Sequence, residues 1–444
     1  MIDEEVIQKM MKSALLRLLG LVALIAVSQP GSAQLRIEIS RGVSGAVPVA
    51  VVPFAYDGRG QPPLDVANLI SDDLLRSGRF APMGRDDMIS RPTTAQDVNF
   101  TDWRLLKTDY VVIGRVVEDG LDRYLLQFQV FDVFRGSQVL GYQFKATAGN
   151  MRAVGHRAAD LIFEKLTGIP GAFSTRVAYV SVVRDQEDLY RLIVADADGA
   201  NPVVIAESGK PIMSPAWSPD GRRIAYVSFE QNRSAVYVQE LATGSRKQVS
   251  ASPGINGAPS FSPDGRWLAL TLSSVDGNLD VHVLNPATGQ KRRLTRNPAI
   301  DTEPAWSIDG KHIYFTSDRS GGPQIYRIPV EGSSSAQRIT FEGRYNARPR
   351  ISPDGKTLAV VHNDRGNYRI AVIDLDRKTT QVLSDGRQDE SPSFAPNGSM
   401  LIYATGSGGR GVLAAVSTDG RVKQSIGAAA GDVREPAWSP YPAD

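Results

Sequence analysis

The sequence predicts a multi-domain protein in which a small N-terminal α/β domain is followed by a six-bladed β-propeller. Two observations predict this fold. A motif of the form Pro-x-Trp/Phe-Ser-Pro-Asp-Gly returns through the C-terminal part of the chain with a period of about 44 residues, the length of one four-stranded blade. The stretch before these repeats alternates between strand-like and helix-like hydrophobic patterns, as α/β domains do.

The repeat occurs six times, and each copy predicts one blade. Its Ser-Pro-Asp-Gly element predicts a tight turn, because proline pre-sets φ and glycine tolerates a positive φ. The apolar runs on either side predict a hairpin, and two further strands complete each blade. The first prolines of the copies are Pro215, Pro259, Pro304, Pro349, Pro392 and Pro436.

A large aromatic residue stands two positions after most of these prolines and predicts packing between blades, since rings that recur at one repeat position are typical of a core. These residues are Trp217, Phe261, Trp306, Phe394 and Trp438.

The two ends of the array complement each other. Residues 176–181 match the second strand of a blade, whereas the copy at 435–440 supplies only a first strand. We therefore expect the C-terminal strand to pair with residues 176–181 and to close the ring non-covalently.

The N-terminal region predicts export. Residues 11–27 combine a short basic start with an apolar core, and small residues precede position 34, as in a secretory signal peptide. We expect cleavage after Ala33, with translation starting at Met10 or Met11. The predicted organisation is a signal peptide at 1–33, an α/β domain with a mobile N-terminal strand at 34–170, and the propeller at 171–444. The chain contains no cysteine, which excludes disulfides and thiol catalysis.

Within the α/β domain, hydrophobic periodicity predicts each element in turn. The expected strands are 48–54, 110–117, 124–134 and 139–146, and the expected helices are 64–77, 101–104 and 151–166. Residues 34–43 alternate between apolar and polar as a half-buried strand would, but stand alone at the terminus. We expect this segment to dock against its own domain or to add as a strand to a partner.

No residue pattern predicts catalysis, so we expect a protein without enzymatic activity or cofactor. The histidines lie in different elements without the spacing of metal ligands: His156, His282, His312 and His362. The glycine-rich residues 406–411 lack the lysine of a phosphate loop and predict a loop between strands. A net charge of +2 gives no electrostatic case for nucleic acid, and no later apolar run is long enough to span a membrane.

The loops that enter the inner strands, and those that join second to third strands, are expected on one face around the central channel. Arginine, carboxylate and amide side chains recur in them. Such a ring of polar groups on a rigid scaffold is suited to recognising a protein partner.

These residues resemble the TolB family of the Tol-Pal system over essentially the whole mature chain. The motifs that carry the resemblance lie at residues 51–54, 163–168, 171–173, 214–221, 256–259, 302–304 and 436–440. The resemblance implies a periplasmic, non-enzymatic scaffold of the Gram-negative envelope, needed for outer-membrane integrity and for constriction during cell division. It implies two partners: the peptidoglycan-associated lipoprotein Pal on the propeller face, and the inner-membrane protein TolA on the N-terminal segment.

Carried onto this chain, the resemblance names two sets of residues. The Pal face comprises Asn256, Gly257, Ala258, Thr302, Glu303 and Arg348. The TolA segment contains Leu35, Arg36, Ile37, Glu38 and Ile39. Other outer-membrane lipoproteins or bacteriocins are further implied partners, and we expect a monomer. Two alternatives stay open: a periplasmic propeller that binds a sugar or small ligand at the channel mouth, and a remnant of a propeller-containing hydrolase.

Overall fold

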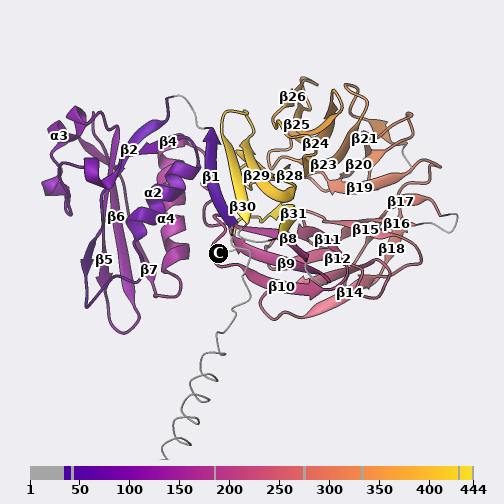
Figure 1. Ribbon diagram of the computed structural model, residues 1–444, viewed down its shortest axis with the longest axis horizontal. Coiled ribbons are helices and arrows are strands. Elements are labelled where there is room, and N and C mark those ends of the chain that lie inside the picture. The colour runs from indigo at the N-terminus through magenta and orange to yellow at the C-terminus, as the bar shows by residue number, and fades with distance from the viewer. Residues whose placement is uncertain are drawn as a thin grey trace, which may run out of the picture.

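The computed structural model describes residues 35–41, 45–184, 187–273, 277–331, 335–428 and 431–442. Figure 1 shows an α/β unit beside a β-propeller. The predicted signal peptide and its cleavage site lie outside the described residues. In the part of the chain that is described, no helix has the length and apolar character needed to cross a membrane.

The α/β unit is built on one mixed sheet with the strand order β4-β2-β5-β6-β7, and β3 pairs with β5. Strands β3 and β4 have three residues each, too short for periodicity to predict. The elements are β2 (Val47–Val51), β3 (Ala55–Asp57), α2 (Val66–Arg76), β4 (Phe80–Pro82), the 3-10 turns η1 (Arg85–Asp87) and η2 (Ala95–Asp97), α3 (Phe100–Leu105), β5 (Tyr110–Glu118), β6 (Tyr124–Asp132), β7 (Ser137–Ala146) and α4 (Met151–Thr167).

Local chemistry sets the limits of the two long helices. Asp65 caps α2 by accepting a hydrogen bond from the backbone N–H of Asn68 at 3.0 Å. Gly168 ends α4 in a left-handed conformation with φ of 73°. Ile70 and Ile162, one on each helix, are fully buried in the same core as the sheet. Both helices lie between the sheet and the propeller (Figure 1), so their other faces form the domain junction.

The propeller contains the six predicted blades, each built of four propeller strands, and β1 (Leu35–Arg41) adds a fifth strand to one of them. In chain order, their strands are β8 (Arg176–Arg184), β9 (Asp188–Asp196), β10 (Val203–Ser208); β11 (Ile212–Trp217), β12 (Arg223–Ser228), β13 (Ala235–Glu240), β14 (Arg246–Ser250); β15 (Asn256–Phe261), β16 (Leu268–Ser273), β17 (Leu279–Leu284), β18 (Lys291–Arg293); β19 (Asp301–Trp306), β20 (His312–Ser317), β21 (Gln324–Pro329), β22 (Gln337–Arg338); β23 (Asn346–Ile351), β24 (Thr357–Asp364), β25 (Asn367–Asp374), β26 (Thr380–Val382); β27 (Glu390–Phe394), β28 (Met400–Ser407), β29 (Arg410–Ser417), β30 (Lys423–Ala428); and β31 (Asp432–Trp438).

The repeat motif acts as its chemistry predicts. In the first copy, Gly221 has a φ of 65° and donates its N–H to the carbonyl of Ser218 at 2.9 Å. The Ser218 hydroxyl donates to Asp220 at 2.5 Å, which fixes the turn. The tryptophans join blades: Nε1 of Trp306 donates to the Ser260 carbonyl of the preceding blade at 3.0 Å. The predicted turn and the predicted packing role of the ring are thus confirmed.

The ring closes as the two ends of the array predict. Strand β31 pairs antiparallel with β8, with Asp432 opposite Val182 and Trp438 opposite Val177. This pairing completes the blade β10-β9-β8-β31 from both ends of the propeller sequence.

The N-terminal strand docks on a surface that the sequence did not predict. Strand β1 (Leu35–Arg41) pairs antiparallel with β30, the outermost strand of the last propeller blade, with Ile37 opposite Ile426. The docking partner is therefore the propeller, and the expectation that the segment packs on its own domain is wrong. An open outer edge offers unpaired backbone N–H and C=O groups, which the strand satisfies.

Hydrogen bonds contribute to the domain junction. The Gln424 side chain on β30 donates to the Arg76 carbonyl at the end of α2. The Asp160 carboxylate on α4 accepts from the backbone of Phe173 at 2.6 Å and from the hydroxyl of Ser174 at 2.5 Å, in the segment that leads into the propeller. Burial, which outweighs these bonds, raises the pKa of Asp160 to about 6.

Candidate functional site

The residue before the repeat proline adopts a left-handed backbone in all six inner strands. These residues are Ser214, Ala258, Glu303, Arg348, Ser391 and Glu435, with φ between 46° and 56°. The pairing register shifts at this point in each strand, as in a β-bulge. A residue before proline normally stays extended, and a positive φ costs a non-glycine residue on the order of 1–3 kcal/mol.

The six bulges place their residues around one central cavity of about 160 Å³. Nε of Arg348 lies 3.0 Å from Oε1 of Glu303, and the Arg348 backbone N–H donates to Oε2 of the same carboxylate at 2.9 Å. On the other side, Nη2 of Arg348 is 3.8 Å from Oε1 of Glu435. Arg348 also donates to the Ser391 hydroxyl, and Glu435 accepts the Ser214 backbone N–H. One arginine thus ties together bulges from several blades.

The charge balance of the cavity favours a fixed Arg348 cation. Burial opposes the charge, but the carboxylates of Glu435, Glu303 and Glu390 outweigh it and raise the pKa of Arg348. The neighbouring Arg350 has a lowered pKa, because it is buried and faces Arg348. The centre of the propeller is therefore a preorganised ionic cluster.

Beyond the ionic cluster, the channel opens into a mouth of about 710 Å³, lined by Tyr345, Tyr368, Glu390, Arg410 and Arg434 among others. Apolar side chains stand on the loops that enter neighbouring blades. Ile255 and Ile300 directly precede inner strands β15 and β19, and each is 46% exposed. Exposed apolar residues, and openings lined by arginine and tyrosine, are typical of surfaces that bind proteins.

The structure brings most of the predicted Pal-face residues together. Ala258, Thr302, Glu303 and Arg348 all line the central cavity, and Gly257 precedes Ala258 on the same strand. Asn256 differs. It is 1% exposed, accepts from the Ser250 hydroxyl at 2.7 Å and donates to the Ser252 carbonyl at 2.7 Å, so its side chain holds the loop instead of facing a partner.

Sequence reasoning missed Ser214, Ser391 and Arg350 as channel residues, whereas Glu435 was expected in a loop around the channel. A signal was available for Ser214 and Ser391, because they occupy the same repeat position as Ala258, Glu303 and Arg348. The five residues named for the TolA segment, Leu35 to Ile39, lie on β1, which pairs with the outermost strand of a blade.

A buried polar cluster at the domain junction was also not visible in the sequence spacing. Nδ1 of His156 on α4 lies 2.6 Å from Asp73 on α2, and its Nε2 lies 3.6 Å from Asp198 in the turn after β9. These three groups have the chemistry of metal ligands. Arg76 pairs with Asp73 and Arg152 with Asp198, so the chain supplies its own cations to these carboxylates.

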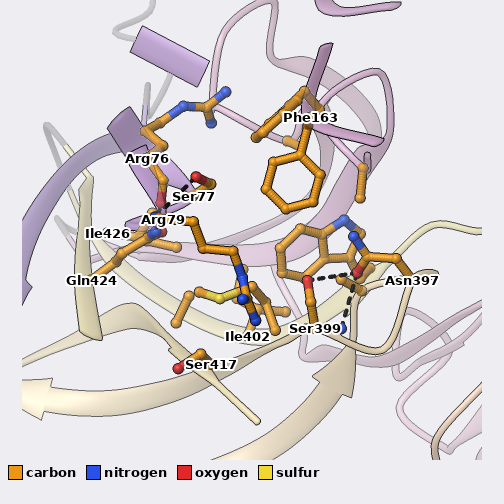
Figure 2. Close-up of a pocket in the computed structure, with 17 residues that line it drawn as sticks. Arg76, Ser77, Arg79, Phe163, Asn397, Ser399, Ile402, Ser417, Gln424 and Ile426 are labelled. Carbon is orange, nitrogen blue, oxygen red and sulfur yellow. Dashed lines mark hydrogen bonds between the residues drawn. The ribbon is translucent and has the colours of Figure 1, made fainter. Parts of the chain in front are cut away.

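A separate cavity of about 60 Å³ lies where α2 and α4 meet the last blade (Figure 2). Phe163, Ile402 and Trp438 contribute to its apolar wall. Arg79, which lies between α2 and β4, reaches into it (Figure 2). Gln424 and Ile426 line the same cavity from β30, the strand that carries β1. The junction and the docking site of the N-terminal strand therefore share residues.

Comparisons with known proteins agree with this architecture. Residues 35–139 match the family model of the TolB amino-terminal domain, and residues 163–442 match that of the TolB beta propeller domain. The chain is 55% identical to the Tol-Pal system protein TolB of Thioalkalivibrio sulfidiphilus, over 92% of this chain and 94% of that protein. It is 53% identical to the Tol-Pal system protein TolB of Nitrosococcus oceani, over 96% and 98% of the two chains.

A solved structure gives the same result at the level of the fold. The crystal structure of TolB from Acinetobacter baumannii is 40% identical in sequence and superimposes with a TM-score of 0.84, covering 92% of this chain and all of that one. Both domains, their order and nearly the full length are thus shared. The chain belongs to the TolB family of Tol-Pal system proteins.

Proposed function

We propose that this protein is a periplasmic, non-enzymatic scaffold that links the outer-membrane lipoprotein Pal to the inner-membrane protein TolA. Through this link it maintains the outer membrane and supports its constriction at cell division. Export by a signal peptide at residues 1–33, an α/β domain at 34–170 and a propeller at 171–444 are part of the proposal. The observation that carries it is membership of the TolB family over nearly the whole chain.

The channel mouth is the proposed Pal site. Three features support this assignment: a preorganised ionic cluster of Glu303, Arg348 and Glu435, a wide opening, and exposed apolar residues on the rim. A protein partner can seat an apolar loop among Ile255 and Ile300 and place polar groups over Arg348. The proposed contacts are Gly257, Ala258, Thr302, Glu303 and Arg348, while Asn256 shapes the loop from within.

The strand β1 is the proposed TolA segment. A seven-residue strand that already pairs along an outer edge has the backbone geometry needed to add to the sheet of another protein. It cannot pair with β30 and with TolA through the same backbone groups at once. Docked and released states of β1 therefore compete, and TolA binds the released state.

The two sites are connected through one blade boundary. Glu435 of the channel stands on β31, whose Val433 and Trp438 pack in the same hydrophobic cluster as Ile426 of β30. A partner that shifts β31 at the mouth therefore also changes the packing of β30, the strand with which β1 pairs. We infer that Pal binding changes the balance between docked and released β1, and hence TolA affinity.

Calorimetric titration of the mature chain with the soluble domain of its own Pal tests the Pal site. The variant Ala258→Arg/Thr302→Arg adds two bulky cations to the central cavity, which shares Glu303 and Arg348 with the mouth, and we expect it to lose binding. The matched control Thr243→Arg/Ser245→Arg adds the same charge on an exposed outer turn and should bind as wild type does. Absence of binding by the wild-type protein would refute the proposal, as would equal binding by both variants.

A further inference from the structure

We propose that the cavity between α2, α4 and the last blade is a binding site for a carboxylate carried on a short apolar group. Binding sites favour domain interfaces, and they combine apolar walls with a few fixed polar groups. This cavity has both features, and it shares no lining residue with the channel mouth.

The wall of the cavity is apolar and rigid. Phe163 and Phe173 pack edge to face with ring centroids 5.5 Å apart, and Trp438 is fixed by a hydrogen bond from its Nε1 to the Thr175 hydroxyl at 2.8 Å. Met400 and Ile402 complete the wall from β28. A volume of about 60 Å³ holds several water molecules or a group of a few carbon atoms, since one water needs about 10–15 Å³.

The polar element of the cavity is Arg79. Its side chain extends into the space between Phe163 and Ile402 in Figure 2. Within the described part of the chain, no hydrogen bond or ion pair within 4 Å engages its guanidinium. Asp419, a carboxylate on which the charge of Arg79 acts, is already occupied by the Ser417 hydroxyl and the Arg421 backbone N–H. An arginine in apolar surroundings without a bound anion is matched by a ligand carboxylate, which it can hold through two parallel hydrogen bonds.

The other polar groups of the rim are already committed. The Asn397 side chain accepts from Ser399 and donates to the Pro170 carbonyl at 2.8 Å, and Gln424 donates to Arg76. These hydrogen bonds link the two domains around the cavity, and they leave Arg79 as the group that favours an anionic ligand. The volume of the cavity limits the ligand to a few carbon atoms, and the positive charge of Arg79 favours an anion. A carboxylate on a short apolar group meets both requirements.

Two sources can supply this chemistry: a free short-chain acid, or the C-terminal residue of a peptide. Titration of the mature chain, followed by two-dimensional NMR, with isobutyrate and with the dipeptide Ala-Ala separates them, because whichever binds tighter identifies the source. We expect saturation in the millimolar range, as a ligand of so few atoms allows. Isobutyramide has the same shape without the charge and should bind at least about tenfold more weakly.

Arg79→Met keeps the length of the side chain and removes its charge, so it should weaken carboxylate binding by about tenfold or more. Arg91→Met, on an exposed loop of the same domain, is the matched control and should bind as wild type does. A melting temperature for each variant confirms folding. The proposal is overturned if neither carboxylate saturates, if isobutyramide binds equally well, or if Arg79→Met binds as tightly as the control.

Discussion

Nε of Arg348 lies 3.0 Å from Oε1 of Glu303, and each residue belongs to the bulge of a different blade. The pair joins two repeats at the centre of the ring, and the same guanidinium lies 3.8 Å from Glu435 of the closing blade. The pairing of β31 with β8 closes the ring, and Arg348 adds an ionic connection between blades at its axis.

Replacing Arg348 by methionine should destabilise the propeller. The substitution leaves Glu303 and Glu435 without their common cation in a confined space. Because Arg348 is partly exposed, we expect a loss on the order of 2 kcal/mol rather than the larger value of a fully buried pair. Urea denaturation monitored at the propeller tryptophans measures it. Arg377→Met, which removes an exposed arginine 4.0 Å from Asp374, should change stability by less than about 0.5 kcal/mol; similar losses in both variants would count against the cluster.

The left-handed bulges predict a distinctive substitution pattern at Ala258, where φ is 46°. Glycine adopts this conformation freely, whereas a β-branched residue does not. We expect Ala258→Val to lower the free energy of unfolding by on the order of 1–2 kcal/mol and Ala258→Gly to change it by less than about 1 kcal/mol. Denaturation curves of the two variants measure this difference. Equal stability of the two would indicate that the backbone at Ala258 is extended in solution.

Docking of β1 predicts protection of β30. Ile37→Pro introduces a residue without a backbone N–H into the strand, which weakens its pairing. Amide hydrogen exchange of Lys423–Ala428 should then accelerate, and exchange in β14, the outer strand of another blade, should not change. The same variant should bind the TolA domain differently from wild type. If β30 exchanges equally fast in wild type and variant, β1 is not docked in solution.

Asp160 predicts a pH dependence of stability. Its pKa is about 6 in the folded protein, against an ordinary value of 3.8. Because the folded carboxyl holds its proton more tightly than the unfolded one, the stability it contributes is greatest below about pH 4. That stability is lost as the pH rises through 6, by about 3 kcal/mol in all.

Asp160→Asn removes this titration and keeps the shape of the side chain. The difference in unfolding free energy between Asp160→Asn and wild type should therefore shift in favour of the variant between pH 4.5 and 7, by about 1–3 kcal/mol. Any constant loss from altered hydrogen bonding to Ser174 cancels in this comparison. Stability curves that stay parallel over the range would show that the carboxylate is ionised throughout.

Local and periodic features were predictable from the sequence, and long-range contacts were not. The repeat period located the blades, and Ser218 to Gly221 located the turn, because these depend on neighbouring residues only. The closing pair β31 and β8 was also predictable, since each half lacked what the other supplied. The left-handed conformation before each proline was not, because the local preference there is for extended backbone and the closed ring overrides it.

The sites show the same division. Ala258, Glu303 and Arg348 were assigned by resemblance, and the repeat position they share could have added Ser214 and Ser391. The buried position of Asn256 depends partly on Ser234, which lies just before β13, 22 residues away in the sequence, and accepts its backbone N–H. The contacts of His156 with Asp73 and Asp198 span both domains, and the pairing of β1 with β30 joins the two ends of the chain. No pattern along the sequence encodes such distances.

The most direct test of the central claim is the affinity of the mature chain for the C-terminal domain of TolA, measured with and without saturating Pal. A scaffold whose channel mouth controls the docking of β1 predicts a change of about fivefold or more, which disappears in Ala258→Arg/Thr302→Arg. Equal TolA affinities in the two titrations would contradict the account and leave two independent binding sites on one chain.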